Sequence, residues 1–231
     1  MTESTPAACT TAICRSVYRA QARAGQASAV AAHFKAKAED ITTGITSGDA
    51  MTLSLFQWGD HFIAYWESVA FELTPDALFG DMHALLEDWP GGLSPHAAAP
   101  RSFVPMMDIF HSQSPQSIEH WRRKQPFERL WGGLARLQPE MVSSYIFYHF
   151  QLQEEKPGSF DKYGIISLHE DLIFYYLEKP AIVEDQRPVG KLSTTNTPDN
   201  WHDVMFPHFH QWDDAPTGEE IWREIELIAH R

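Results

Sequence analysis

Histidine and tryptophan, two residue types that often do chemistry, are concentrated in residues 201–212, which read WHDVMFPHFHQW. Imidazole can transfer protons near neutral pH and can bind metals. His208 and His210 follow a proline two residues apart, so on an extended segment both would face one side, as a metal-binding pair requires. The same residues also fit the polar edge of an amphipathic helix end. We adopt this second interpretation and expect no bound metal.

The tryptophans of this segment suggest a different kind of site. Indole rings stack on the flat C–H faces of sugars, while sugar hydroxyls need hydrogen-bond donors and acceptors. Trp201, His202, Trp212 and Asp213 have the side chains that a sugar pocket needs. Each of them could equally be a structural residue of the core.

His33 is the candidate acid/base residue of the first half. It lies in residues 26–43, which we predict to be a helix, and Glu39 follows six residues later. If His33 points from this helix into a closed barrel, it can donate and accept protons. On the outer face of the helix it would be an ordinary surface histidine, and this alternative stays open.

An internal repeat indicates which elements position these residues. Residues 51–67 consist of two short apolar strands around a tight turn at Gly59-Asp60, and residues 163–178 have the same pattern around residues 169–171. A helix start follows each hairpin, at Thr74-Pro75-Asp76 and at Thr197-Pro198-Asp199, because threonine caps helices and proline suits the first turn.

The repeat predicts an α+β protein of two tandem ferredoxin-like halves. Each half would have a first strand, the hairpin, a helix and a last strand; the first and last strands are expected at residues 13–21 and 102–111, and at 142–153 and 221–230. The second half has no room for a helix before its hairpin, so a helix over residues 116–137 is expected to replace it. The predicted organisation is residues 1–112, a connecting helix within 113–140, and residues 141–231. Antiparallel sheets from the two halves would close into one intramolecular barrel, because their apolar faces need cover. Two independent lobes side by side are the alternative.

Charge and composition restrict the partners. The formal net charge is −13, which disfavours nucleic acid, and we interpret the one basic cluster, Arg122–Lys124, as a solvated face. No apolar run approaches the roughly 20 residues that span a bilayer, and the first eleven residues show no signal-peptide pattern. We therefore expect no membrane partner and a cytoplasmic protein. Cys9 and Cys14 could form a small loop disulfide, but we expect free thiols.

These features resemble the L-rhamnose mutarotases, a family of dimeric α+β barrels. That family has a helix whose histidine is the proton donor, with glutamate six residues later, as at His33 and Glu39. Its second helix has a tryptophan pair with methionine three residues on, which Trp201-His202 and Met205 match. The family tyrosine one helical turn before the histidine corresponds to Ala29. The family's hairpin tyrosine corresponds to Thr52 in the first half, whereas Tyr163 fits it in the second half.

The resemblance implies an enzyme that interconverts sugar anomers by general acid/base catalysis. His33 would be catalytic, and Tyr163, Trp201 and His202 would bind a monosaccharide. It implies no cofactor and is compatible with a homodimer.

Two other functions stay open on the same fold. One is a haem protein or a cofactor-free oxygenase; His149, His208 and His210 are the candidate haem ligands. The other is a non-catalytic protein that binds a small ligand.

Overall fold

The computed structural model describes residues 8–89 and 100–231 and is an α+β structure with two antiparallel sheets. The chain forms two compact units that are not continuous in sequence. Residues 1–106, 115–124 and 226–231 form the first unit, and residues 107–114 and 125–225 form the second.

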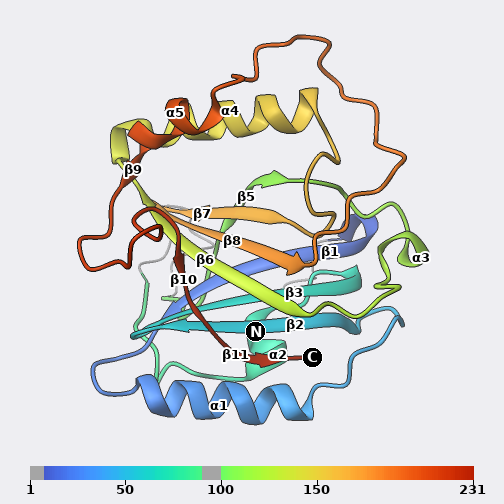
Figure 1. Ribbon diagram of the computed structural model, residues 1–231. Coiled ribbons are helices and arrows are strands. Elements are labelled where there is room, and N and C mark those ends of the chain that lie inside the picture. The colour runs from blue at the N-terminus through green and yellow to red at the C-terminus, as the bar shows by residue number, and fades with distance from the viewer. Residues whose placement is uncertain (1–7, 90–99) are drawn as a thin grey trace. The chain divides into compact units, whose positions relative to one another are not determined.

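The sheet of the first unit has the strand order β11-β2-β3-β1-β4. These strands are β1 (Ala8–Gln21), β2 (Ala50–Trp58), β3 (His61–Phe71), β4 (Val104–Pro105) and β11 (Glu226–His230). The helices of the unit are α1 (Ala27–Asp40), α2 (Pro75–Phe79) and α3 (Ile118–Trp121). In Figure 1, α1 runs along one side of β2 and β11.

The sheet of the second unit has the order β10-β6-β8-β7-β5, with β9 also paired to β6. Its strands are β5 (Met107–His111), β6 (Arg129–Leu137), β7 (Ile165–His169), β8 (Leu172–Lys179), β9 (Phe209–His210) and β10 (Arg223–Glu224). Its helices are α4 (Val142–Glu155) and α5 (Trp201–Met205), with short 3-10 turns at η2 (Pro139–Met141) and η3 (Phe206–His208).

The two predicted hairpins and the helix start at Thr74-Pro75-Asp76 are confirmed, and the helix start at Thr197-Pro198-Asp199 is wrong. β2 and β3 pair around Gly59, β7 and β8 pair around Glu170, and both turn residues have positive φ, 60° and 58°. The Thr74 hydroxyl caps α2 by accepting from the Ala77 N–H. α5 begins later than expected, with Asn200 as its N-cap residue.

Two predicted elements are wrong. The helix expected over residues 116–137 is the four-residue α3 followed by strand β6, and the strand expected over residues 142–153 is helix α4. Gly132-Gly133 disfavours a helix in the first segment. In the second, an aromatic and β-branched composition that suits a strand is overridden by burial at helical spacing, at Tyr145, His149 and Leu152.

With these corrections both halves have the same βαββαβ order. The first half reads β1-α1-β2-β3-α2-β4, and the second reads β6-α4-β7-β8-α5-β10. The second half therefore has its own helix before the hairpin and needs no replacement. Closure of the two sheets into one barrel stays a prediction, as does the homodimer.

Each half ends in a strand that is divided between the two sheets. β4 pairs with β1, but β5, which follows after Met106, pairs with β7. In the same way β10 pairs with β6, and β11, which follows after Ile225, pairs with β2. Met106 and Ile225 are both buried.

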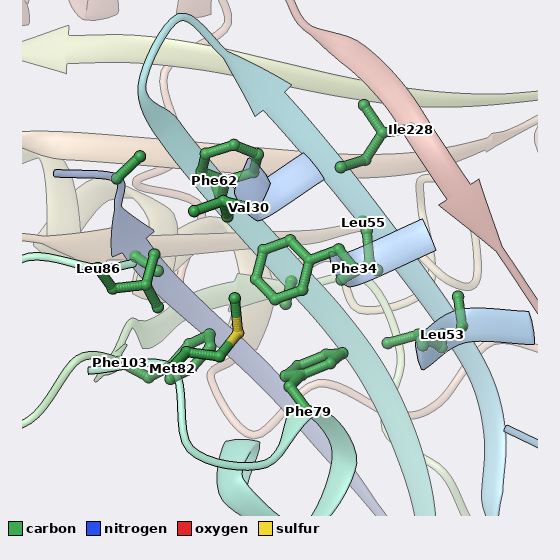
Figure 2. Close-up of a cluster of buried hydrophobic side chains, with 14 of the residues drawn as sticks. Val30, Phe34, Leu53, Leu55, Phe62, Phe79, Met82, Leu86, Phe103 and Ile228 are labelled. Carbon is green, nitrogen blue, oxygen red and sulfur yellow. The ribbon is translucent and has the colours of Figure 1, made fainter. Parts of the chain in front are cut away.

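The core of the first unit is closed by aromatic side chains between its sheet and its helices (Figure 2). Phe34 of α1 contacts Phe62 and Phe79 edge to face, with ring centroids 5.5 and 4.9 Å apart. Phe79 stacks on Phe103 at 5.7 Å. These rings fill the space between α1 and the sheet. Phe34 and Phe79 are therefore almost inaccessible to solvent.

The first unit also contains a buried ion pair. Glu67 of β3 is fully buried, and Arg123 donates two hydrogen bonds to its carboxylate, one of them at 2.9 Å. The Tyr65 hydroxyl donates a third bond at 2.5 Å. Arg123 is therefore not part of a solvated basic face, because it holds the segment after α3 against β3.

We expect Arg123→Ala to destabilise the protein by about 3–5 kcal/mol, because it leaves the Glu67 carboxylate buried without its main cation. Burial by itself raises the pKa of Glu67, but Arg123, Arg15 and the Tyr65 hydroxyl together lower it below its ordinary value. A lowered carboxyl pKa stabilises the folded state above the ordinary value and loses this effect as pH falls through the folded value.

Urea denaturation at pH 7 measures the change in the free energy of unfolding. The matched control is Arg122→Ala, which removes a neighbouring exposed arginine and should change stability by only about 0.5 kcal/mol. Equal effects of the two substitutions would contradict a special role for the Glu67–Arg123 pair.

Candidate functional site

A cavity of about 470 Å³ lies in the second unit, between its sheet and its helices. α4 and α5 lie on the same side of β7 and β8 in Figure 1, and both contribute to the cavity wall. Most of the lining is aromatic or aliphatic. The lining residues are Phe110, Tyr145, His149, Leu152, Phe160, Ile166, Tyr175, Trp201, His202, Met205, Phe206, Phe209, Ile221 and Trp222.

His149 is the most buried imidazole of this lining, with 5% of its surface exposed. Its Nδ1 lies 3.0 Å from the carbonyl oxygen of Tyr145, one helical turn earlier. Because a carbonyl only accepts, we assign the ring hydrogen to Nδ1. Nε2 then carries the lone pair, and it has no hydrogen-bond partner within the described residues. The helix thus fixes both the tautomer and the direction of the free acceptor.

The rings around His149 keep it uncharged. Tyr145, Trp201 and Phe110 surround it, with centroids 4.0, 5.0 and 5.7 Å away. This burial lowers the pKa of His149 to about 4; the bond to the Tyr145 carbonyl opposes the shift, and nearby His208 adds to it. At neutral pH the imidazole is therefore an acceptor of hydrogen bonds and a weak base.

The two tyrosines of the lining are also neutral. Burial raises the pKa of Tyr145 well above its ordinary value, and the neighbouring Tyr175 raises it further. Burial likewise raises the pKa of Tyr175, with Asp161 contributing in the same direction. The cavity therefore offers a ligand hydroxyl groups and a lone pair, but no formal charge from these three residues.

Tryptophans form part of the wall. Trp201 of α5 contacts the edge of His149, and Trp222 packs against Tyr175 and Phe209 with centroids 5.7 and 6.1 Å away. Flat aromatic surfaces of this kind favour a planar or ring-shaped ligand.

The repeat shows how the two halves differ at the position beside this cavity. α1 and α4 both contain 14 residues, and their eighth residues are Phe34 and His149. In the first half, Phe34 packs against three other phenylalanines and the space is filled. In the second half, the equivalent position has the smaller, polar ring of His149 at the edge of a cavity.

The structure brings together two of the four predicted site residues. Trp201 and His202 both line the cavity, and their role in binding a ligand stays a prediction. Tyr163 is buried, with the ammonium group of Lys162 5.7 Å from its ring centroid, and it does not line the cavity.

His33 is half-buried on α1, where its Nε2 lies 2.8 Å from the carbonyl oxygen of Phe79. It does not line the cavity of the second unit. A site formed jointly by His33, Tyr163 and Trp201 stays a prediction.

The two histidines of the predicted pair, His208 and His210, have different surroundings. His208 is buried, with its Nε2 2.8 Å from the Ser144 hydroxyl and its Nδ1 3.2 Å from the Met205 carbonyl, while His210 is exposed. Among residues 8–89 and 100–231, no group of three histidine, cysteine, aspartate or glutamate side chains is arranged to hold a metal ion.

The structure also bears on two other predictions, the free thiols and the absence of a membrane-spanning segment. Cys14 is disulfide-bonded, which corrects the predicted free thiols, and Cys9 is the other cysteine of the chain. In the part of the chain that the structure describes, no helix has the length and apolarity needed to cross a membrane.

Tyr145 as a site residue was missed by the sequence analysis, and His149 was named only as a haem ligand. Both lie in the segment predicted to be a strand, on which they would have faced the same side without the helical turn that joins them. The i, i+4, i+7 spacing of Tyr145, His149 and Leu152 is the signal that indicates their shared helical face.

Comparisons with known proteins give little further information. No family model matches the sequence, and no curated protein matches it. A crystal structure from Fusobacterium nucleatum subsp. nucleatum, described as a "Putative monooxygenase", aligns with 96% of this chain and 95% of its own. The TM-score is 0.43 and the sequence identity is 7%, so this similarity carries no argument about function.

We expect the stability of the protein to fall between pH 6.5 and pH 4, by up to about 1.4 kcal/mol per pH unit, because His149 must stay neutral in the folded state. The sign follows from the lowered pKa: in this range the unfolded chain binds the proton and the folded chain does not. His149→Phe should remove this part of the pH dependence.

The measurement is urea denaturation at several pH values. His202→Ala is the control, since it removes an exposed imidazole from the same cavity and should leave the slope unchanged. An unchanged slope in His149→Phe would show that His149 is not held neutral by burial.

Proposed function

We propose that the cavity of the second unit binds a planar, mainly apolar small molecule that donates a hydrogen bond to Nε2 of His149. The observation that carries this proposal is a buried imidazole with a fixed tautomer and an unused acceptor at the surface of an aromatic cavity. This acceptor has no partner within the described residues, so a ligand that supplies a donor gains a hydrogen bond there.

Size and chemistry support this class of ligand. A volume of about 470 Å³ falls in the usual range for small-molecule pockets, roughly 300–1,000 Å³. The walls formed by Trp201, Trp222 and Phe209 provide flat apolar contacts on several sides. A compound of a few fused rings with a hydroxyl group combines the two requirements.

Sugar mutarotation, the activity that the family resemblance implies, has less support. A monosaccharide carries hydroxyls around the whole ring, whereas the lining offers few polar partners. The reaction also needs a group that gives up a proton near neutral pH, and His149 is held neutral. The roles assigned to His33, Tyr163, Trp201 and His202 in that reaction remain untested.

A cofactor-free oxygenase is the second candidate, and the lone pair of His149 favours it. A ligand with an acidic O–H or C–H can pass its proton to Nε2, and the electron-rich anion that remains can react with O₂. The low pKa of His149 requires a ligand that is itself acidic. Haem has the least support, because no lysine or arginine among the lining residues is available to pair with its propionates.

The sequence predicts a cytoplasmic location, but the disulfide at Cys14 is more typical of an oxidising compartment.

We expect 2-naphthol to bind about tenfold more tightly than 2-methylnaphthalene, because only 2-naphthol can donate to Nε2 and one buried hydrogen bond contributes about 1–1.5 kcal/mol. Quenching of tryptophan fluorescence reports binding, since Trp201 and Trp222 line the cavity. In His149→Phe the preference for 2-naphthol should disappear.

His202→Ala serves as the control and should keep the preference, because His202 lies at the exposed edge of the lining. Equal binding of the two probes to the natural protein would contradict the proposal. Saturation-transfer NMR showing binding of free sugars, with neither probe bound, would favour the mutarotase hypothesis instead.

A further inference from the structure

An aspartate, a histidine and a serine are hydrogen-bonded in series on β5 and the residues after it. His111 Nδ1 lies 2.8 Å from Asp108 Oδ2, and His111 Nε2 lies 2.9 Å from the Ser114 hydroxyl oxygen. The carboxylate only accepts, so Nδ1 carries the hydrogen and Nε2 is free to accept the serine proton. This is the order of atoms that activates a serine nucleophile.

A local irregularity in β5 makes this arrangement possible. In a regular strand, residues 108 and 111 would face opposite sides. The register of β5 against β7 shifts between Asp108 and Phe110, so both side chains reach the same side. Bulges of this kind often re-aim side chains next to active sites.

The segment around His111 is held firmly. Gln153 Oε1 accepts from the His111 N–H at 2.8 Å. Ser112 is buried; its N–H donates to the Gly164 carbonyl and its hydroxyl to the Phe160 carbonyl. These hydrogen bonds hold the backbone of His111 and Ser112 at the end of β5. They thereby position Ser114 against the imidazole of His111.

His83 also lies near an aspartate and a serine, but these three residues are not hydrogen-bonded in series. Ser102 and Asp88 both lie within hydrogen-bond distance of His83, at 2.8 and 2.7 Å, but both contact the same nitrogen, Nδ1. A carboxylate and a hydroxyl that share one nitrogen cannot hold the ring and pass a proton through it. Only the His111 cluster, of these two, connects the serine and the aspartate through opposite ring nitrogens.

We propose that Ser114, His111 and Asp108 form a serine-nucleophile centre that hydrolyses small activated esters. The Ser114 oxygen attacks the ester carbonyl while its proton moves to Nε2 of His111. The C–O bond to the alcohol breaks, the alcohol takes this proton, and the acyl group stays on Ser114. Water then gives a proton to His111 and attacks the acyl group. The bond between the acyl carbon and the Ser114 oxygen breaks, Ser114 takes the proton back from His111, and the carboxylic acid leaves.

The surroundings of the cluster define the substrate class. The side chains of His111 and Asp108 are 27% and 41% exposed, and Ser114 is exposed. The Ser114 backbone N–H has no hydrogen-bond partner within the described residues and can donate to the developing oxyanion. One donor in a water-accessible site stabilises that charge less than a closed oxyanion hole. The substrates are therefore esters with good leaving groups, such as phenyl esters, and amides are excluded.

The test is labelling of the full chain with a fluorophosphonate, followed by peptide mass spectrometry. In this reaction an Oγ–P bond forms at Ser114, the P–F bond breaks, and His111 takes the hydroxyl proton. We expect one adduct, on Ser114, and none in Ser114→Ala. Asp108→Asn should slow labelling at least about tenfold, because it no longer fixes the tautomer of His111.

His83→Ala is the matched control and should label at the natural rate. Burst hydrolysis of p-nitrophenyl acetate, with acetyl-Ser114 found by mass spectrometry, is the second readout, because surface histidines can hydrolyse this ester without acylating serine. Circular dichroism checks that each variant is folded. Absence of the Ser114 adduct, labelling at the same rate in Asp108→Asn, or labelling that depends on His83 would overturn the proposal.

Discussion

The division of each half's last strand between two sheets is the constraint on which the rest of the structure depends. A sheet edge has unpaired N–H and C=O groups that must be covered. β5 covers the edge of β7, and β11 covers the edge of β2, each after a single buried residue, Met106 or Ile225. Because of this exchange Phe110, which belongs to the last strand of the first half, lines the cavity formed by the second.

Because β5 pairs at the edge of the second sheet, it can contribute both to the cavity wall and to the Asp108–His111 hydrogen bond. Phe110 faces α4 and closes one side of the cavity, while the bulge beside it turns Asp108 toward His111. An edge strand tolerates such a bulge because it has a neighbour on one side only. The same strand in the centre of the sheet would lose hydrogen bonds on both sides.

The two halves show how a repeated fold can separate stability from function. At the eighth position of the first helix, one half has Phe34 inside a set of packed rings and the other has His149 beside empty space. Filling a core with aromatic rings stabilises a fold, whereas a cavity and a buried imidazole both destabilise it. The well-packed half can compensate for the other, as proteins commonly do around functional sites.

The sequence predicts the repeated parts of the fold because their signals are local. Turn residues fix both hairpins, and Thr74-Pro75 fixes the start of α2. The predictions for β6 and α4 were wrong because the composition of each segment conflicts with its periodicity. Tertiary packing decides the secondary structure there. Arg123 could not be placed, because its partner Glu67 is 56 residues away and nothing local distinguishes it from Arg122.

The candidate site was only half predictable for a related reason. Trp201 and His202 stand out by residue type, but the geometry of His149 depends on a helix that its composition does not predict. The same geometry determines what the cavity can select. In a chain with a net charge of −13, three of the polar side chains that line it, His149, Tyr145 and Tyr175, are held neutral by burial. Discrimination between ligands must then depend on the direction of hydrogen bonds and on shape, because these groups supply no charge to attract an ion. A ligand with a formal charge would lose its hydration without gaining a counter-ion from these three side chains, so they disfavour anions and cations alike.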